Sequence, residues 1–83
     1  MRLIHFTAEW CHPCKMMKPI VDDVLSERPD LEYIAIDIDK DTPIAVEYGV
    51  LGVPTFIIED NGVIVRRIQG AMTKNQFVSI LSD

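Results

Sequence analysis

Cys11 and Cys14 are the two cysteines of the 83-residue chain, and His12 and Pro13 separate them. An apolar, strand-like run precedes the pair and a helix-like periodic run follows it, so the pair lies at the predicted start of a helix. Unpaired N–H groups and the positive end of the helix dipole favour a thiolate there. The short spacing lets the sulfurs bridge reversibly. The pattern predicts thiol–disulfide exchange, with Cys11 as the nucleophile and Cys14, a turn further in, as the resolving thiol.

A zinc site is one alternative for these cysteines, because two thiolates supply half of the four ligands that zinc normally takes. His5 and His12 are the histidines that could complete the set, and His12 is trapped between the cysteines. Structural or incidental cysteines are the other alternative. We favour the redox interpretation over both, and we expect no metal and no cofactor beyond the redox-active pair.

The composition predicts a single globular domain over residues 1–83. Hydrophobic residues make up 48% of the chain, which is enough for a core, and the net charge is −5. An acidic chain is a poor ligand for phosphate backbones, so we expect no nucleic-acid partner, and we expect a monomer. The opening residues are too short and too polar for a signal peptide, and no apolar run approaches membrane-spanning length. We therefore expect no membrane association and a reducing cytoplasm, which is the host cytosol if the protein is viral.

Hydrophobic periodicity predicts the element order β-α-β-α-β-β-α. The expected strands cover residues 2–7, 31–38, 55–59 and 63–68. The expected helices cover roughly 11–26, with a kink at Pro19, then about 43–48, and a last helix that carries Phe77 to Leu81. A β-α-β start requires parallel strands, and the last two strands form an antiparallel hairpin. The fold class is therefore α/β, with one mixed four-stranded sheet flanked by helices.

Local signals mark the ends of these elements. Thr42 followed by Pro43 is typical of an N-cap and a first-turn proline, and Gly49 is typical of a helix stop. Asn61-Gly62 predicts a tight hairpin, because both residues tolerate positive φ. Thr73 with Gln76 three residues later predicts a capping box.

A longer run of residues around the cysteines has a family pattern. Its members are Ala8-Glu9-Trp10-Cys11, Pro13-Cys14-Lys15-Met16 and Pro19. Further matches follow in order at Asp37 and Asp39, Tyr48-Gly49-Val50, Gly52-Val53-Pro54-Thr55, Asn61-Gly62 and Gly70-Ala71. Together they resemble the thioredoxin family over nearly the whole chain, and the resemblance implies a thioredoxin-like fold.

The resemblance also implies a surface for docking substrate disulfides. In that family the proline that matches Pro54 is cis and faces the cysteines. The implied substrate-binding residues are Trp10, His12, Pro13, Val53, Pro54, Gly70 and Ala71. Taken singly, Trp10 could equally be a core residue and Val53-Pro54 an ordinary loop.

Three departures from the family pattern stand out. The sequence starts at the strand that leads to the cysteines, which gives the chain the extent of a glutaredoxin. His12 replaces a small glycine and resembles the more oxidising members, such as protein disulfide isomerase, although theirs adjoins the second cysteine. His5 and Ala35 stand where thioredoxins have a buried aspartate and a nearby lysine. We hypothesise that His5 takes the proton of Cys14, directly or through one water; the alternative is an inert core histidine.

The resemblance implies reduction of protein disulfides, with electrons from a thioredoxin-reductase-like flavoenzyme and with ribonucleotide reductase or other cytosolic disulfides as substrates. The nearer alternative is a glutaredoxin-like enzyme recharged by glutathione. The short architecture favours that alternative, while Trp10-Cys11 and Gly70-Ala71 argue against it. A more distant alternative is a binding module whose thiols are dispensable. The acidic series at 37, 39 and 41 is interpreted as a solvated strand end.

Overall fold

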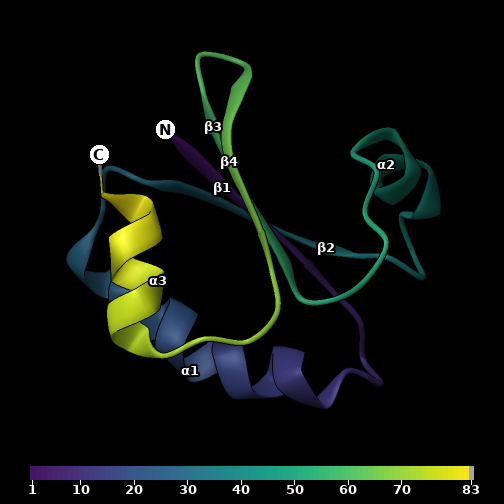
Figure 1. The fold of residues 1–83 in the computed structure, drawn as a ribbon, viewed down its shortest axis with the longest axis horizontal. Helices are drawn as coiled ribbons and strands as arrows, with labels where there is room; N and C mark the ends of the chain where they lie inside the picture. The colour runs from purple at the N-terminus through teal and green to yellow at the C-terminus, as the bar shows by residue number, and fades with distance from the viewer. Residues whose placement is uncertain (83) are drawn as a thin grey trace.

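The computed structural model describes residues 1–82, in which strands and helices alternate up to the third strand and the fourth strand follows the third directly (Figure 1). The strands are β1 (Arg2–Thr7), β2 (Glu32–Asp37), β3 (Thr55–Asp60) and β4 (Val63–Gln69). The helices are α1 (His12–Glu27), α2 (Thr42–Glu47) and α3 (Lys74–Leu81). The predicted order β-α-β-α-β-β-α is confirmed, and the predicted boundaries differ from these by only one or two residues.

The four strands form one mixed sheet in the order β2-β1-β3-β4. β1 pairs with β2 in parallel, as a β-α-β unit requires, and His5 lies opposite Ala35. β3 is antiparallel both to β1 and to β4. The β3–β4 turn has Asn61 at φ 53° and Gly62 at φ 80°, so both central residues adopt the positive φ that the hairpin signal predicted.

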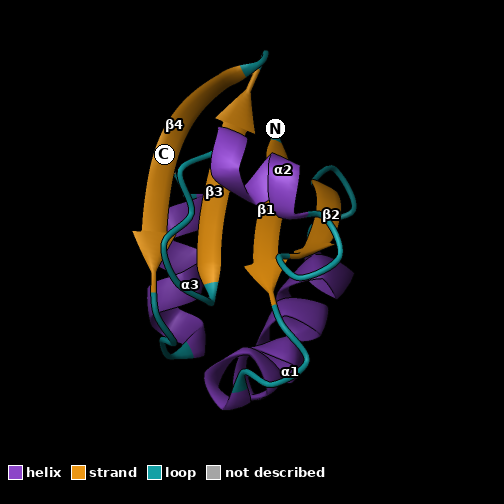
Figure 2. Cartoon of the chain, turned by 90° about the vertical axis from the view of Figure 1, so that its right-hand side faces the viewer, coloured by secondary structure: helices purple, strands orange, loops and turns teal. Residues whose placement is uncertain are grey.

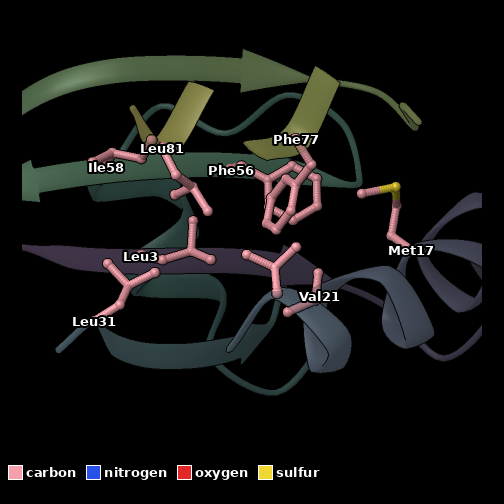
Figure 3. Close-up of a cluster of buried hydrophobic side chains, with 9 residues drawn as sticks. Leu3, Met17, Val21, Leu31, Phe56, Ile58, Phe77 and Leu81 are labelled. Carbon is pink, nitrogen blue, oxygen red and sulfur yellow. The ribbon is translucent and has the colours of Figure 1, made fainter. Parts of the chain in front are cut away.

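Helices cover the two faces of the sheet unequally. α1 and α3 lie side by side on one face, and the short α2 lies on the other (Figures 1 and 2). Alternation along β1 sends Leu3 toward α1 and α3, and Ile4 and Phe6 toward α2. The core on the α1 and α3 face, most of which Figure 3 shows, consists of Leu3, Met17, Val21, Val24, Leu31, Phe56, Ile58, Phe77 and Leu81.

The capping box of the last helix forms as predicted. Thr73 Oγ1 accepts a hydrogen bond from the Gln76 N–H at 3.2 Å, and Gln76 Oε1 accepts one from the Thr73 N–H at 2.9 Å. Each bond satisfies a backbone donor that the first turn of a helix leaves without an intrahelical partner. The start of α3 is therefore determined by its own sequence.

The predicted N-cap of the second helix is wrong. Asp41 occupies the cap position without a side-chain cap bond, and Thr42 is the first helical residue. The Thr42 hydroxyl instead donates to the carbonyl of Ile38 at 2.8 Å. Pro43 does lie in the first turn, and Gly49 follows the last turn with φ 67°, as predicted.

Among residues 1–82, no helix combines the length and the apolar character needed to span a membrane.

Candidate active site

Cys11 and Cys14 are joined by a disulfide at the start of α1, so the structure shows the oxidised protein. Cys11 is the N-cap residue, and its Sγ accepts a hydrogen bond from the Cys14 N–H at 3.2 Å. Pro13 lies in the first turn, where its missing N–H removes no helical bond, and His12 and Pro13 are both exposed. Both sulfurs therefore lie at the N-terminus of a helix, as the sequence predicted.

The two cysteines are equally buried, at 2% and 3% exposure. They form a small apolar cluster with Ala8, against which Ile38 and Val53 pack. Exposure in this oxidised form therefore does not distinguish a nucleophile from a resolving thiol. The surroundings do distinguish them, since Cys14 lines an adjoining cavity whose lining does not include Cys11.

The cavity has a volume of about 310 Å³ and lies behind Cys14. It is bounded by β1, the start of α1 and β2, and its lining is His5, Thr7, Ala8, Glu9, Cys14, Lys15, Lys18, Tyr33, Ala35 and Asp37. The side of β1 that carries His5 therefore faces Cys14, a choice that strand alternation had left open. Because Glu9, Lys15 and Lys18 are exposed, the cavity opens to solvent.

His5 is 4% exposed, and its two ring nitrogens have different surroundings. Nδ1 lies 3.0 Å from the hydroxyl of Tyr33, while Nε2 is buried without a hydrogen-bond partner among residues 1–82. The ring stacks on Phe56 with centroids 4.5 Å apart. Burial, and secondarily the charge of Lys18, lowers the pKa of His5 from 6.5 to about 4, so the ring is neutral at pH 7.

Tyr33 is also neutral, because burial and then the charge of Asp22 raise its pKa to about 12. The Tyr33–His5 contact thus joins two neutral groups, each of which can act as donor or acceptor. Tyr33 is 36% exposed and borders solvent. The pair therefore extends from a buried ring beside the Cys14 cavity to the protein surface.

A backbone hydrogen bond joins two of the segments that the resemblance implies in substrate docking, Val53-Pro54 and Gly70-Ala71. The Val53–Pro54 peptide bond is cis, as the resemblance implied. The Gly70 N–H donates to the Pro54 carbonyl at 2.9 Å, and Gly70 has φ 108°, a conformation that favours glycine. Val53 packs on the cysteine cluster, while Gly70 is half-buried and Ala71 is exposed. Residues far apart in the sequence are thus brought close to the disulfide.

Trp10 is 67% exposed, which excludes the core alternative for this side chain. Its indole N–H donates to Asp39 Oδ2 at 2.8 Å. The Asp39 N–H in turn donates to Asp37 Oδ1 at 2.9 Å. Asp39, one member of the acidic series predicted to be only a solvated strand end, therefore holds the indole of Trp10, the residue before Cys11.

Sequence reasoning singled out His5 but missed Tyr33 and Lys18. Tyr33 is two residues from Ala35 along β2, on the same side of the strand, and Ala35 pairs with His5. That register was the available signal for Tyr33, since alternate residues of paired strands share a face. Lys18 lies one turn after Cys14 on α1, and helical spacing was the available signal for it.

Within residues 1–82, no group of three or more His, Cys, Asp or Glu side chains is arranged to hold a metal ion.

Comparison with known proteins agrees with this geometry. The family model described as thioredoxin matches residues 1–83. A thioredoxin from Chlamydia trachomatis is 36% identical over 80 residues, which are 96% of this chain and 78% of the relative. A bifunctional thioredoxin reductase/thioredoxin from Mycobacterium leprae is 39% identical over 82 residues, which are 98% of this chain and 18% of the relative.

Solved structures show the same fold. The crystal structure of a thioredoxin from Nicotiana alata superposes with a TM-score of 0.91 at 34% identity, covering 96% of this chain and 69% of that one. A structure concerned with thiol resolving in a yeast mitochondrial 1-Cys peroxiredoxin via glutathione/thioredoxin systems gives a TM-score of 0.88 at 32% identity, covering 94% and 73%. With its disulfide at the start of α1, the chain belongs to the thioredoxin family and is a protein disulfide oxidoreductase.

Proposed function

We propose that this protein reduces protein disulfides by dithiol exchange through Cys11 and Cys14, acting as a single domain over residues 1–83. The observation that carries the proposal is the position of both sulfurs at the N-terminus of α1, where they form a disulfide. Unpaired helical N–H groups favour a thiolate at that end. The reduced protein would supply two electrons and two protons to one substrate disulfide.

We assign attack to Cys11. Its thiolate bonds to one substrate sulfur and expels the other, which forms a mixed disulfide. Cys14 then attacks Cys11 Sγ, which closes the Cys11–Cys14 bond and releases the second substrate thiol. The assignment is supported by Cys11 being the N-cap residue, whereas Cys14 lies inside the first turn and lines the cavity that also contains His5.

We propose that His5 accepts the proton of Cys14 during the second step. A buried thiol resists ionisation, because desolvation disfavours the anion. A neutral imidazole that lines the same cavity can receive the proton without first being a buried charge, directly or through one water. The cavity has room for water, which takes about 30 Å³ per molecule in the liquid.

We propose that an exposed surface around the disulfide receives the substrate. At its centre is the cis Val53–Pro54 bond, where Val53 is half-buried and the Pro54 side chain is buried, and where the Gly70 N–H donates to the Pro54 carbonyl. Around that centre we place the remaining substrate-binding residues, which are Trp10, His12, Pro13 and Ala71. The exposed indole of Trp10, held by Asp39, offers an apolar platform beside the sulfurs.

For the electron donor we propose a thioredoxin-reductase-like flavoenzyme, and we place the reaction of the monomer in the cytoplasm. The similarity to a protein that fuses thioredoxin reductase to thioredoxin supports this donor. A glutathione and glutaredoxin system is the second candidate. Turnover of a disulfide substrate with NADPH and thioredoxin reductase, compared with glutathione and glutathione reductase, distinguishes the two donors.

The thiol roles are tested by replacing each cysteine with serine. We expect Cys11→Ser to abolish reduction of a model protein disulfide such as insulin, because no nucleophile remains. Cys14→Ser should accumulate a covalent mixed disulfide with the substrate, because the resolving thiol is absent, and mass spectrometry of the acid-quenched mixture detects it. Accumulation in Cys11→Ser instead would reverse the assignment.

The same cysteine variants test the binding-module alternative. A domain whose thiols are dispensable would retain its biological role when both cysteines are serine. Loss of that role in the double variant, with the fold retained, supports the enzyme. Full retention would contradict the proposed function.

A further inference from the structure

Two observations about His5 go beyond its role as a proton acceptor. Nδ1 is 3.0 Å from the Tyr33 hydroxyl, and Nε2 is buried with no partner among residues 1–82. His5, Tyr33 and Cys14 all line one cavity. The ring therefore has one nitrogen bound to a surface-bordering hydroxyl and a second nitrogen available to a group inside the site.

The tautomer of a neutral imidazole determines what each nitrogen can do. If Nδ1–H donates to the Tyr33 oxygen, Nε2 carries a lone pair and can accept a proton. If the Tyr33 O–H donates to Nδ1, Nε2 carries a hydrogen and can give one up. To pass from the first arrangement to the second, Nε2 gains a hydrogen, the Nδ1 hydrogen moves to the Tyr33 oxygen, and the original hydroxyl hydrogen leaves to solvent.

We propose that Tyr33 is a positioning residue for the resolving step, that Tyr33 and His5 relay a proton between Cys14 and solvent, and that the direction of their hydrogen bond reverses with the redox state. The proposal rests on the proposed dithiol exchange. In the reduced protein Nδ1–H donates to Tyr33, and in the oxidised protein the Tyr33 O–H donates to Nδ1. The relay runs outward when substrate is reduced and inward when the dithiol is regenerated.

The resolving step balances as follows. The Cys14 proton passes to Nε2, the Nδ1 proton passes to the Tyr33 oxygen, and the former hydroxyl proton passes to water. The electron pair left on Cys14 Sγ forms the bond to Cys11 Sγ, and the bond from Cys11 Sγ to the substrate sulfur breaks. The substrate leaves as a thiolate and takes one proton from solvent. Regeneration by an external dithiol reverses the proton transfers. The imidazole ring therefore keeps the same orientation throughout and does not have to flip.

The electrostatic surroundings favour a relay over a stored charge. The charged groups around the cavity are Glu9 before α1, Lys15 and Lys18 on α1, and Asp37 on β2, with Asp22 acting on Tyr33. On the β3 side, His5 meets the uncharged ring of Phe56. Burial and Lys18 lower the pKa of His5 to about 4, so an imidazolium there would release its proton at once.

The first test measures the tautomer of His5 in the unmodified protein. Two-bond ¹H–¹⁵N correlation spectra at pH 7 distinguish a hydrogen on Nδ1 from one on Nε2, and the chain has two histidines to assign. We expect Nε2–H in the oxidised protein and Nδ1–H after reduction with dithiothreitol. The same tautomer in both forms would overturn the proposal without any variant having to fold.

The second test compares Tyr33→Phe with Tyr48→Phe. Tyr33→Phe removes the hydroxyl and keeps the ring. Tyr48→Phe makes the same change at a hydroxyl that donates to Glu59 at 2.9 Å, outside the cavity lining. In single turnovers quenched with acid, we expect decay of the mixed disulfide to slow at least tenfold in Tyr33→Phe, while its formation by Cys11 keeps its rate. Tyr48→Phe should change neither rate, and the redox-dependent tautomer change should be lost in Tyr33→Phe alone.

The possible outcomes distinguish a failure of the proton relay from a failure of dithiol exchange. Decay in Tyr33→Phe at the wild-type rate would overturn the relay and leave dithiol exchange standing. Equal slowing in both tyrosine variants would also overturn it, because the effect would not depend on the hydroxyl at His5. A wild-type protein that forms no mixed disulfide would overturn the proposed function itself.

Discussion

Burying a histidine makes the stability of the folded state sensitive to acid, because on acidification the unfolded chain binds a proton that the buried ring does not bind. The folded pKa of His5 is about 4 and the usual value is 6.5, so the unfolded state binds more protons between these pH values. Stability should therefore be unaffected by His5 above about pH 6.5 and should fall as the pH drops toward 4. The shift corresponds to a loss of about 3 kcal/mol at pH 4.

Urea denaturation of the oxidised protein at pH 7, 5 and 4 measures this loss. His5→Gln keeps a polar side chain but does not titrate, so the pH dependence of wild type minus variant isolates the ring. We expect that difference to shrink by about 3 kcal/mol between pH 7 and pH 4. Parallel pH curves for the two proteins would show that the ring is not desolvated in solution.

The residues of the site were predictable from the sequence to different degrees. The roles of Cys11 and Cys14 follow from a motif contained within a few residues, and the cis Val53–Pro54 bond was implied by the family resemblance. The Tyr33–His5 contact joins residues 28 positions apart. It depends on which face of β1 meets α1 and on the register of β2, and neither is encoded locally.

At the scale of elements, two threonines with similar sequence signals have different roles. Thr73 caps α3 with both bonds of the capping box, whereas Thr42 donates to Ile38 and leaves the cap to Asp41. What differs is the chain before each threonine. A carbonyl is within reach of the Thr42 hydroxyl only because the turn after β2 brings Ile38 back, and hydrophobic patterning does not report such a turn.

Thr73→Ala should destabilise the protein by about 1 kcal/mol, because it leaves a first-turn N–H of α3 unsatisfied. Thermal or urea denaturation at pH 7 measures the change. Ser79→Ala, on the same helix, is the matched control, and we expect it to be neutral or slightly stabilising because alanine favours helix. A neutral Thr73→Ala would mean that packing alone determines where α3 begins.

At the scale of the whole molecule, one layer of side chains joins the site to the core. α1 begins with the cysteines and continues with Met17, Val21 and Val24, which pack in the same cluster as Phe77 of α3 (Figure 3). The Phe77 ring is fully buried and meets Phe56 edge-on at 5.1 Å between centroids. The position of the disulfide therefore depends on packing that α3 completes.

Phe77→Ala should cost about 3–5 kcal/mol, which is the usual range for removing a buried ring. A domain of this size has roughly 4–12 kcal/mol of total stability, so a large part of it would be lost. Val78→Ala changes the next residue, which is 42% exposed, and should shift stability by less than about 0.5 kcal/mol. Denaturation midpoints of the two variants check the contrast. Similar midpoints would show that α3 contributes little to the core.

The strand order has a consequence for the exchange of amide hydrogens with solvent. Within residues 1–82, β1 and β3 are central, whereas β2 is an edge strand whose ladder partner is β1. Edge strands open in small fluctuations, while central strands are protected until most of the structure opens. His5 is therefore on a strand of slow exchange and Tyr33 on one of fast exchange. Local opening of β2 separates the hydroxyl from the ring while His5 and the disulfide keep their places.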